Sequence, residues 1–116
     1  MNFPAHAYPI TIPQGADFEK VWTYYPDGTD SPAKNWTGWT GAAQLRRRIE
    51  DTTALATFTV TLGGSAGTVT ITLPHATTSG LDPGRAYYDV ELTETATGKV
   101  TRLVGGQAQI TAEVTR

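Results

Sequence analysis

The side chains in this sequence that could perform acid–base or metal chemistry are few and far apart. His6 lies near the N-terminus and His75 lies beyond the middle of the chain, and neither has another histidine or a cysteine close to it. A lone histidine is far more often solvated or structural than a metal ligand, because a metal site needs several converging donors. Asp89 and Glu91 lie on the same side of one extended segment, whereas a glycosidase needs two carboxylates that face each other across the sugar. We therefore expect no metal site and no cofactor.

The motifs of nucleophilic and phosphate-binding enzymes are also missing. Residues 63–67 are rich in glycine, but no Lys-Ser/Thr pair follows them, as a phosphate-binding loop requires. No Gly-x-Ser-x-Gly sequence occurs, and the absence of cysteine excludes thiol chemistry and disulfides. The sequence therefore predicts a protein that is not an enzyme and has no catalytic residues.

The sharpest charge feature is the run Arg46-Arg47-Arg48. It could contact nucleic acid or an acidic protein, or it could be a strand end with alternate arginines directed into solvent. The formal net charge of −2 provides no broad basic surface of the kind that nucleic acid requires. We predict that Arg46 and Arg48 contact a protein partner, and we do not expect nucleic acid as a partner.

Residues 1–13 contain three prolines, which exclude a helix and weaken any central strand. Phe3, Tyr8 and Ile10 are apolar for a solvated tail. They either pack back as an edge strand or dock on another subunit. We predict an extended N-terminal arm at residues 1–13, with these three side chains as partner contacts, followed by a single domain at residues 14–116.

The remaining chain has the pattern of short strands joined by tight turns. The clearest strands are 54–62 and 67–73, where apolar residues alternate strictly with threonines. The threonine faces are either solvent surface or a flat pairing surface for a neighbouring subunit. A short helical turn is expected within 74–80. Further strands are expected at 17–25, 39–48, 81–92, 100–104 and 108–114, with Gly105-Gly106 separating the last two.

The strand within residues 81–92 follows a Pro-Gly turn. The spacing Leu-x-Pro-Gly-x-x-Tyr, which ends at Tyr87, is similar to the tyrosine corner of immunoglobulin-like sandwiches, where the hydroxyl bonds back across the turn. Strand parity selects Tyr88 instead, because burying Tyr87 would also bury Asp89 and Glu91. We predict that Tyr88 faces the core.

A length of 116 residues suits one domain with one modest core. Many short strands with frequent turns are typical of a sandwich; a barrel is the alternative, and the tyrosine-corner-like turn favours the sandwich. Either Trp36 or Trp39 would be the core tryptophan of such a fold. The sequence predicts an all-β protein, an immunoglobulin-like antiparallel β-sandwich of seven or eight strands with an extended N-terminal arm.

The run Ile-Pro-Gln-Gly-Ala-Asp-Phe at 12–18 resembles the opening of small proteins encoded in the structural gene clusters of tailed phages. In those proteins a Leu-Thr-Gly-[Tyr/Trp]-Thr segment and an arginine-rich strand end follow. Residues 35–40 and 44–46 occupy these places here, with Trp36 where the usual leucine stands, and the strand at 88–92 also fits. The chain is similar, too, to the immunoglobulin-like N-terminal domains of phage baseplate upper proteins, which hold receptor-binding proteins on the tail.

This resemblance implies a virion structural protein that serves as a tail, baseplate or fibre-attachment adaptor. Its partners would be other virion proteins, with several copies in each particle, and it would be made in the cytoplasm of the bacterial host. We expect no signal peptide and no contact with a membrane. One alternative is a capsid decoration protein, which an extended arm would also suit. Another is a carbohydrate-binding module that uses exposed tryptophans as stacking platforms, namely Trp22, Trp36 or Trp39.

Overall fold

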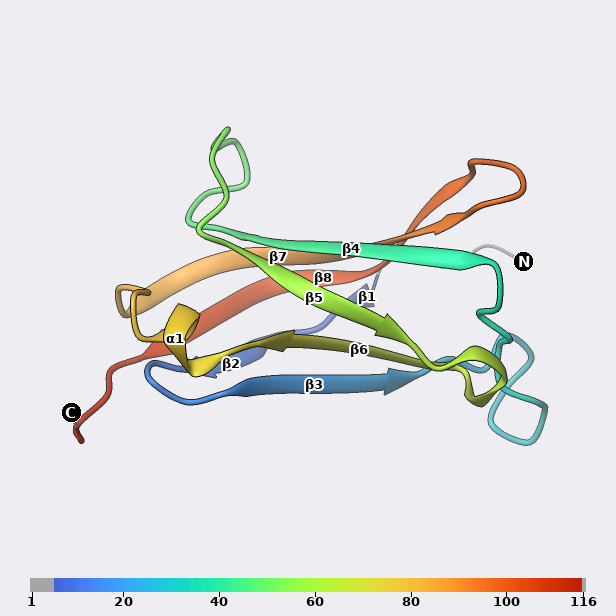
Figure 1. Cartoon of the computed structure of the whole chain (residues 1–116), viewed down its shortest axis with the longest axis horizontal. Coiled ribbons are helices and arrows are strands. Elements are labelled where there is room, and N and C mark those ends of the chain that lie inside the picture. Colours follow the sequence, from blue (N-terminus) through green and yellow to red (C-terminus); the bar gives the residue numbers. More distant parts are fainter. Residues whose placement is uncertain (1–5, 116) are drawn as a thin grey trace.

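The computed structural model describes residues 6–115 and shows an all-β protein with one short α-helix (Figure 1). The predicted all-β class and the helical turn after residue 74 are confirmed. No helix in the described part is long and apolar enough to span a bilayer. The elements are β1 (His6–Ala7), β2 (Ile10–Pro13), β3 (Phe18–Thr23), β4 (Trp39–Arg46), β5 (Ala56–Leu62), the 3-10 turn η1 (Gly64–Ala66), β6 (Thr68–Leu73), α1 (His75–Thr78), β7 (Gly84–Glu94) and β8 (Val100–Thr111).

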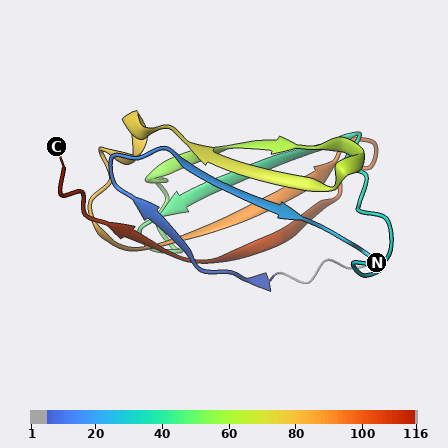
Figure 2. The ribbon, with the colours of Figure 1, turned by 90° about the horizontal axis from the view of Figure 1, so that it is seen from below.

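The strands form two layers that share β5 (Figures 1 and 2). In the first layer β8, β7 and β4 lie side by side, with β1 and β2 on the outer side of β8 and the start of β5 next to β4. In the second layer the rest of β5 pairs with β6, and β6 pairs with β3. Pairing is antiparallel except at β1 and β2, which run parallel to β8. The predicted antiparallel sandwich is therefore correct apart from this first edge.

The core lies between the two layers, and strand alternation fills it as the sequence predicts. Phe58 and Ile71 point inward, whereas the threonines next to them point outward or are only partly covered. A fully buried aliphatic or aromatic side chain contributes about 1.5–3 kcal/mol to folding. The largest fully buried side chains are Trp36, Ile12, Leu45, Ile71, Leu73, Leu92 and Ile110.

The division predicted at residue 13, between an arm and a domain, is wrong for the described part of the arm. β1 and β2 pair with β8 and continue directly into the turn before β3 (Figure 2). Ile10 is 6% exposed and Ile12 is fully buried. The hydrophobic gain from these side chains favours docking on the chain's own sheet, and an edge strand tolerates proline. Residues 6–13 are therefore an integral edge strand, which was one of the two alternatives for this segment.

The break predicted at Gly105-Gly106 is also wrong, because β8 runs through both glycines. Gly105 lies opposite Asp89 and Gly106 opposite Tyr88 in the ladder with β7. A Cβ on Gly106, whose φ is +154°, would come within 3.1 Å of the carbonyl oxygen of Tyr8. Gly106 therefore permits close approach of the first strand to β8, and Gly105 permits close approach of β7, where a Cβ would come within 3.1 Å of the carbonyl oxygen of Tyr88.

Tyr88 occupies the core position that strand parity predicts, with 5% of its surface exposed. Its hydroxyl donates a 2.6 Å hydrogen bond to the backbone carbonyl of Tyr8, and burial raises the pKa of Tyr88. The bond therefore reaches across to the first edge strand and not back across the adjacent turn, as a tyrosine corner would. Tyr87 is partly exposed on the outer side of the sheet.

The core tryptophan is Trp36, which is 1% exposed. It lies in the loop before β4 and not in the strand, and its indole N–H donates to the carbonyl of Gly67 at 3.1 Å. Trp39 begins β4 and packs against Trp36 edge-to-face while remaining partly exposed. The loop residue takes the core position because its indole N–H finds a carbonyl partner there.

Replacing Leu92 with alanine should lower the free energy of unfolding by about 2–5 kcal/mol, because Leu92 is fully buried and its truncation leaves a cavity. The matched control is Glu91→Ala, one residue away on the solvent side, which should change stability by less than about 0.5 kcal/mol. Chemical denaturation of both variants measures the difference. A larger loss for Glu91→Ala would contradict the register of β7.

Replacing Tyr88 with phenylalanine should cost about 1 kcal/mol, since the aromatic ring stays while the carbonyl of Tyr8 loses its buried donor. Tyr87→Phe is the control, because the Tyr87 hydroxyl makes no hydrogen bond within residues 6–115. Denaturant titrations of the two variants measure their free energies of unfolding. Equal losses would show that the bond to Tyr8 contributes nothing to stability.

Candidate functional site

An open groove of about 500 Å³ lies on the outer side of the first layer, across β4, β7, β8 and β1. Its lining includes Ala7, Arg46, Ile49, Tyr87, Asp89 and Arg102. All but Ile49 are held by strands, so the sheet fixes the shape of the groove. Ile49 lies in the turn that follows β4 and is 74% exposed.

The register of the strands explains why the surface is hollow here. One row across the sheet runs from Ala7 in β1 through Gly105 and Asp89 to Gln44, and its first two positions carry almost no side-chain bulk. The row on one side carries Arg46 opposite Tyr87, and the row on the other carries Arg102 opposite Glu91. Two rows of long side chains therefore flank a row that is low at Ala7 and Gly105.

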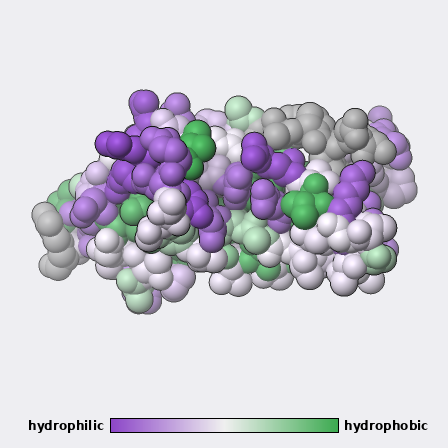
Figure 3. Space-filling model, turned by 90° about the horizontal axis from the view of Figure 1, so that it is seen from above, coloured by the Kyte–Doolittle hydropathy of each residue, from purple (hydrophilic) through white to green (hydrophobic). Residues whose placement is uncertain are grey.

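The two arginines that line the groove make polar contacts with other residues of the chain. Arg102 lies 3.4 Å from the carboxylate of Asp89, in a pair that remains largely solvent-accessible. Arg46 donates one hydrogen bond to the side chain of Gln44 and another to the backbone carbonyl of Asp51. Figure 3 shows hydrophilic surface on this side of the molecule, interrupted by isolated hydrophobic residues. One ion pair therefore lies in the groove beside an exposed isoleucine and a tyrosine.

The three consecutive arginines have three different environments. Arg46 lines the groove, whereas Arg47 donates to the carbonyls of Asp82 and Arg85 and thereby ties the end of β4 to the start of β7. Arg48 is exposed, and its guanidinium makes no hydrogen bond or ion pair within the described residues. Arg46 and Arg48 therefore do not form a single patch, and the part they play in partner contact stays a prediction.

The structure gives a different outcome for each of the three partner contacts predicted in the N-terminal segment. Phe3 lies outside the described residues. Ile10 is buried in the protein's own core, so the prediction that it contacts a partner is wrong. Tyr8 is 37% exposed, and it packs edge-to-face on Trp22 while the ammonium of Lys20 lies 4.8 Å from its ring centre. Tyr8 thus helps to close the gap between the two layers, and its side chain turns Lys20 inward.

The tryptophans do not form the exposed platforms that sugar stacking would need. Trp36 is buried, and both Trp22 and Trp39 pack against the core with only part of their surfaces exposed. Trp22 stacks on Tyr88 at 6.5 Å between ring centroids. None of the three tryptophans is fully exposed, and the carbohydrate-binding alternative stays a prediction.

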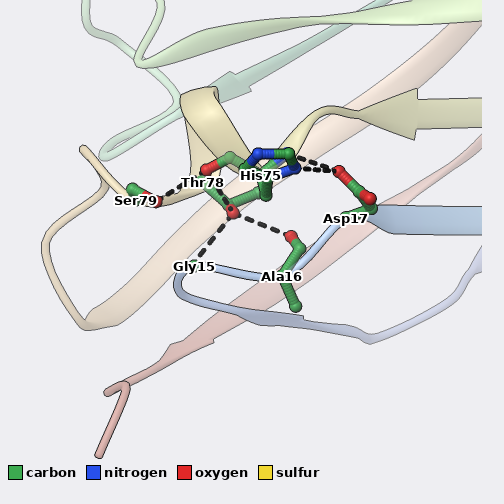
Figure 4. A network of polar contacts seen from close by, with 6 residues as sticks. All are labelled: Gly15, Ala16, Asp17, His75, Thr78 and Ser79. Atoms are coloured by element: carbon green, nitrogen blue, oxygen red, sulfur yellow. Dashed lines mark hydrogen bonds and ion pairs between the residues drawn. The ribbon is translucent and has the colours of Figure 1, made fainter. Parts of the chain in front are cut away.

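A polar network that the sequence did not suggest joins the start of β3 to α1 (Figure 4). The backbone N–H of His75 donates to the carboxylate of Asp17 at 2.7 Å, and the imidazole Nδ1 lies 2.9 Å from the same oxygen. The backbone donor, followed by the imidazole, lowers the pKa of Asp17. Strand pairing brings the two residues together, because Phe18 lies opposite Leu73. Only the pairing of β3 with β6 would have predicted this contact. The residue pattern within one strand does not show which strands pair.

The network contains a serine, a histidine and an aspartate, the residue types of a hydrolytic triad. Ser79, however, donates its hydroxyl hydrogen bond to the backbone carbonyl of His75 and not to the imidazole (Figure 4). The side chains of His75 and Asp17 are 68% and 76% exposed, so no enclosed pocket surrounds them. The geometry is that of a structural cap on α1 and not of an activated nucleophile.

The Gln-Gly-Ala-Asp run at 14–17, which carried the sequence resemblance, forms a brace at this end of the sandwich. Gln14 donates to the carbonyl of Leu81 and accepts from the N–H of Glu113. The N–H of Gly15 donates to the buried hydroxyl of Thr78, which in turn donates to the carbonyl of Ala16 (Figure 4). We call residues 14–17 the Gln14–Asp17 brace. It connects the β2–β3 turn to α1, to the turn before β7 and to the chain after β8.

Among the described residues, no cluster of three or more histidine, cysteine, aspartate or glutamate side chains could hold a metal ion. The expectation of a protein without metal, cofactor or catalytic residues stays a prediction.

Comparison with known proteins identifies the fold alone. No protein-family model and no curated protein matches the chain. The immunoglobulin-like structure of the NK cell receptor Nkp44 aligns with 92% of this chain and 100% of its own, with a TM-score of 0.53 and 14% sequence identity. A family 123 glycoside hydrolase from Clostridium perfringens aligns with 96% of this chain and 24% of its own, with a TM-score of 0.42 and 10% identity. The likeness to Nkp44 confirms the predicted immunoglobulin-like fold.

Asp17→Ala should lower the melting temperature at neutral pH, because the N–H of His75 loses its carboxylate acceptor. The pKa of Asp17 is lowered in the folded protein, so its stabilisation is present above the ordinary aspartate pKa of about 3.9 and is lost as the pH falls through the folded value. The melting temperatures of variant and wild type should therefore converge in acid. Asp30→Ala, at an exposed loop residue, is the control and should have no such pH-dependent effect. A difference that stayed constant down to acid pH would contradict this role.

Proposed function

We propose that this protein is a non-enzymatic attachment module of a tailed-phage virion, acting in the tail or baseplate through contacts with other virion proteins. The observation that carries the binding role is the groove across β4, β7, β8 and β1. The assignment to a phage particle rests on the sequence resemblance centred on residues 12–18. Several copies would be present in each particle, and the protein would be made in the cytoplasm of the bacterial host.

The groove has the properties of a docking site for a protein segment. Its floor is low at Ala7 and Gly105, so a partner side chain can enter there without rearranging the sheet. Its walls offer tyrosine and arginine, which are enriched at protein interfaces, and Ile49 adds an exposed apolar contact. The Arg102–Asp89 pair at the surface favours specificity and orientation more than affinity.

The alternatives have less support. A capsid decoration role drew on an extended arm, and residues 6–13 are part of the sheet. Carbohydrate binding drew on exposed tryptophans, and these pack against the core. The attachment role needs neither feature.

Incorporation into particles tests the proposal. In a phage that carries this gene, the substitution Ile49→Lys or Glu91→Lys would be introduced into the phage genome. Both change exposed residues at the groove without removing core contacts. Each variant should fold normally, as judged by its melting temperature, and should be depleted at least about tenfold from purified particles, the effect of losing about 1.4 kcal/mol of binding. Quantitative gels of the particles measure this loss.

Thr61→Lys, on the outer side of the second layer, is the control and should be incorporated like the wild type. Absence of the wild-type protein from purified particles would overturn the virion assignment. Normal incorporation of both groove variants would overturn the groove as the attachment site.

A further inference from the structure

The second layer ends in a strand whose outer edge is open. β3 is the last strand in the order of the sheet and pairs with β6 on one side. On its other side it pairs with no strand among the described residues. An open edge presents unpaired N–H and C=O groups, which form a template for another strand.

The register shows which groups of β3 are open. The N–H of Tyr24 donates to the carbonyl of Gly67, and this pair continues the β3–β6 ladder. In an antiparallel ladder the bonded pairs alternate, so the even-numbered residues of β3 bond to β6 and the odd-numbered ones direct their N–H and C=O groups away from it. The outward-directed residues are Glu19, Val21 and Thr23. No hydrogen bond within the described residues uses these backbone groups.

Two features that often protect an edge, a proline and a β-bulge, are missing from β3. Phe18–Thr23 contains no proline, and its pairing with β6 has no bulge. The strand carries two charges, Lys20, which lies over the ring of Tyr8, and the exposed Glu19 near one end of the strand. Val21, at the centre of the strand, is 45% exposed and lies opposite Thr70. The neighbouring outer surface is uncharged along β6 and the second half of β5, where it consists of threonines.

We propose that a second copy of this chain pairs with β3, edge to edge and antiparallel, about a two-fold axis at Val21. This proposal does not depend on the groove or on the virion assignment. A two-fold axis at Val21 places Val21 opposite its own counterpart and Glu19 opposite Thr23 of the other copy. The pairing is self-complementary, because it brings two exposed valines together and opposes no like charges.

The pairing is short, and its expected affinity is correspondingly low. The outward groups of the three residues in each copy would form about six backbone hydrogen bonds. The uncharged threonine surfaces of the two copies would then continue from one sheet into the other. An edge contact of this size falls at the weak end of specific interfaces, so the dimer should form in a concentration-dependent way.

Disulfide trapping tests the register directly, because the wild-type chain contains no cysteine. In Val21→Cys the two introduced thiols would face each other in a hydrogen-bonded pair, with a Cα separation of about 5.5 Å that permits a disulfide. Mild oxidation of the purified full chain should therefore produce a covalent dimer. In Glu19→Cys the two thiols would be about 13 Å apart along the strands, too far for a disulfide. That variant should remain largely monomeric.

Sedimentation over a concentration series tests the same contact without cross-linking. Val21→Lys would place two ammonium groups opposite each other and should weaken self-association at least about tenfold, the equivalent of about 1.4 kcal/mol. Thr61→Lys adds the same charge to β5, away from the edge, and should leave self-association nearly unchanged.

A wild-type protein that stays monomeric throughout, with no disulfide in Val21→Cys, would overturn the proposal and leave the edge to a strand from a different protein. Equal cross-linking of Val21→Cys and Glu19→Cys would also overturn it, since random collision would then explain both. Self-association that Val21→Lys does not weaken would assign the contact to another surface.

Discussion

The hydrogen bond from the Tyr88 hydroxyl to the carbonyl of Tyr8 is the contact on which much of this architecture depends. Tyr8 immediately precedes Pro9, which has no N–H to contribute to the parallel ladder with β8. The hydroxyl of Tyr88 supplies a hydrogen-bond donor to the edge strand next to this proline. The ring of Tyr88 also stacks on Trp22 of the opposite layer. One side chain therefore holds the first strand in place and joins the two layers.

The close approach of strands that this contact needs also shapes the surface. Side chains on Gly105 and Gly106 would collide with the backbone of Tyr88 or Tyr8, so these positions carry none. The same absence leaves a shallow floor on the outer side of the sheet, between the row of Tyr87 and the row of Arg102. The groove is thus built mainly from strand residues, and the turn after β4 adds Ile49 to its lining. The sheet keeps its shape fixed.

The groove and the open edge of β3 belong to different layers. The first layer approaches β3 where Tyr8 packs on Trp22. The Gln14–Asp17 brace fixes the turn that joins these layers, through bonds to Thr78, Leu81 and Glu113. This connection gives the most recognisable run in the sequence a structural task, independent of any partner.

The sequence by itself determined the features that depend on neighbouring residues. Alternation in the threonine-rich strands predicted the all-β fold and its core, and parity selected Tyr88 over Tyr87, since each follows from the two-residue repeat of a strand. Only the tertiary structure decided what depends on distant pairing. The prolines of residues 1–13 and the glycines at 105–106 predicted an extended arm and a break, whereas β1 and β2 pair with β8, and β8 runs through both glycines. The pair of Asp17 with His75, the groove and the open edge arise in the same way, because strand order is a property of the whole chain and leaves no mark on any one segment.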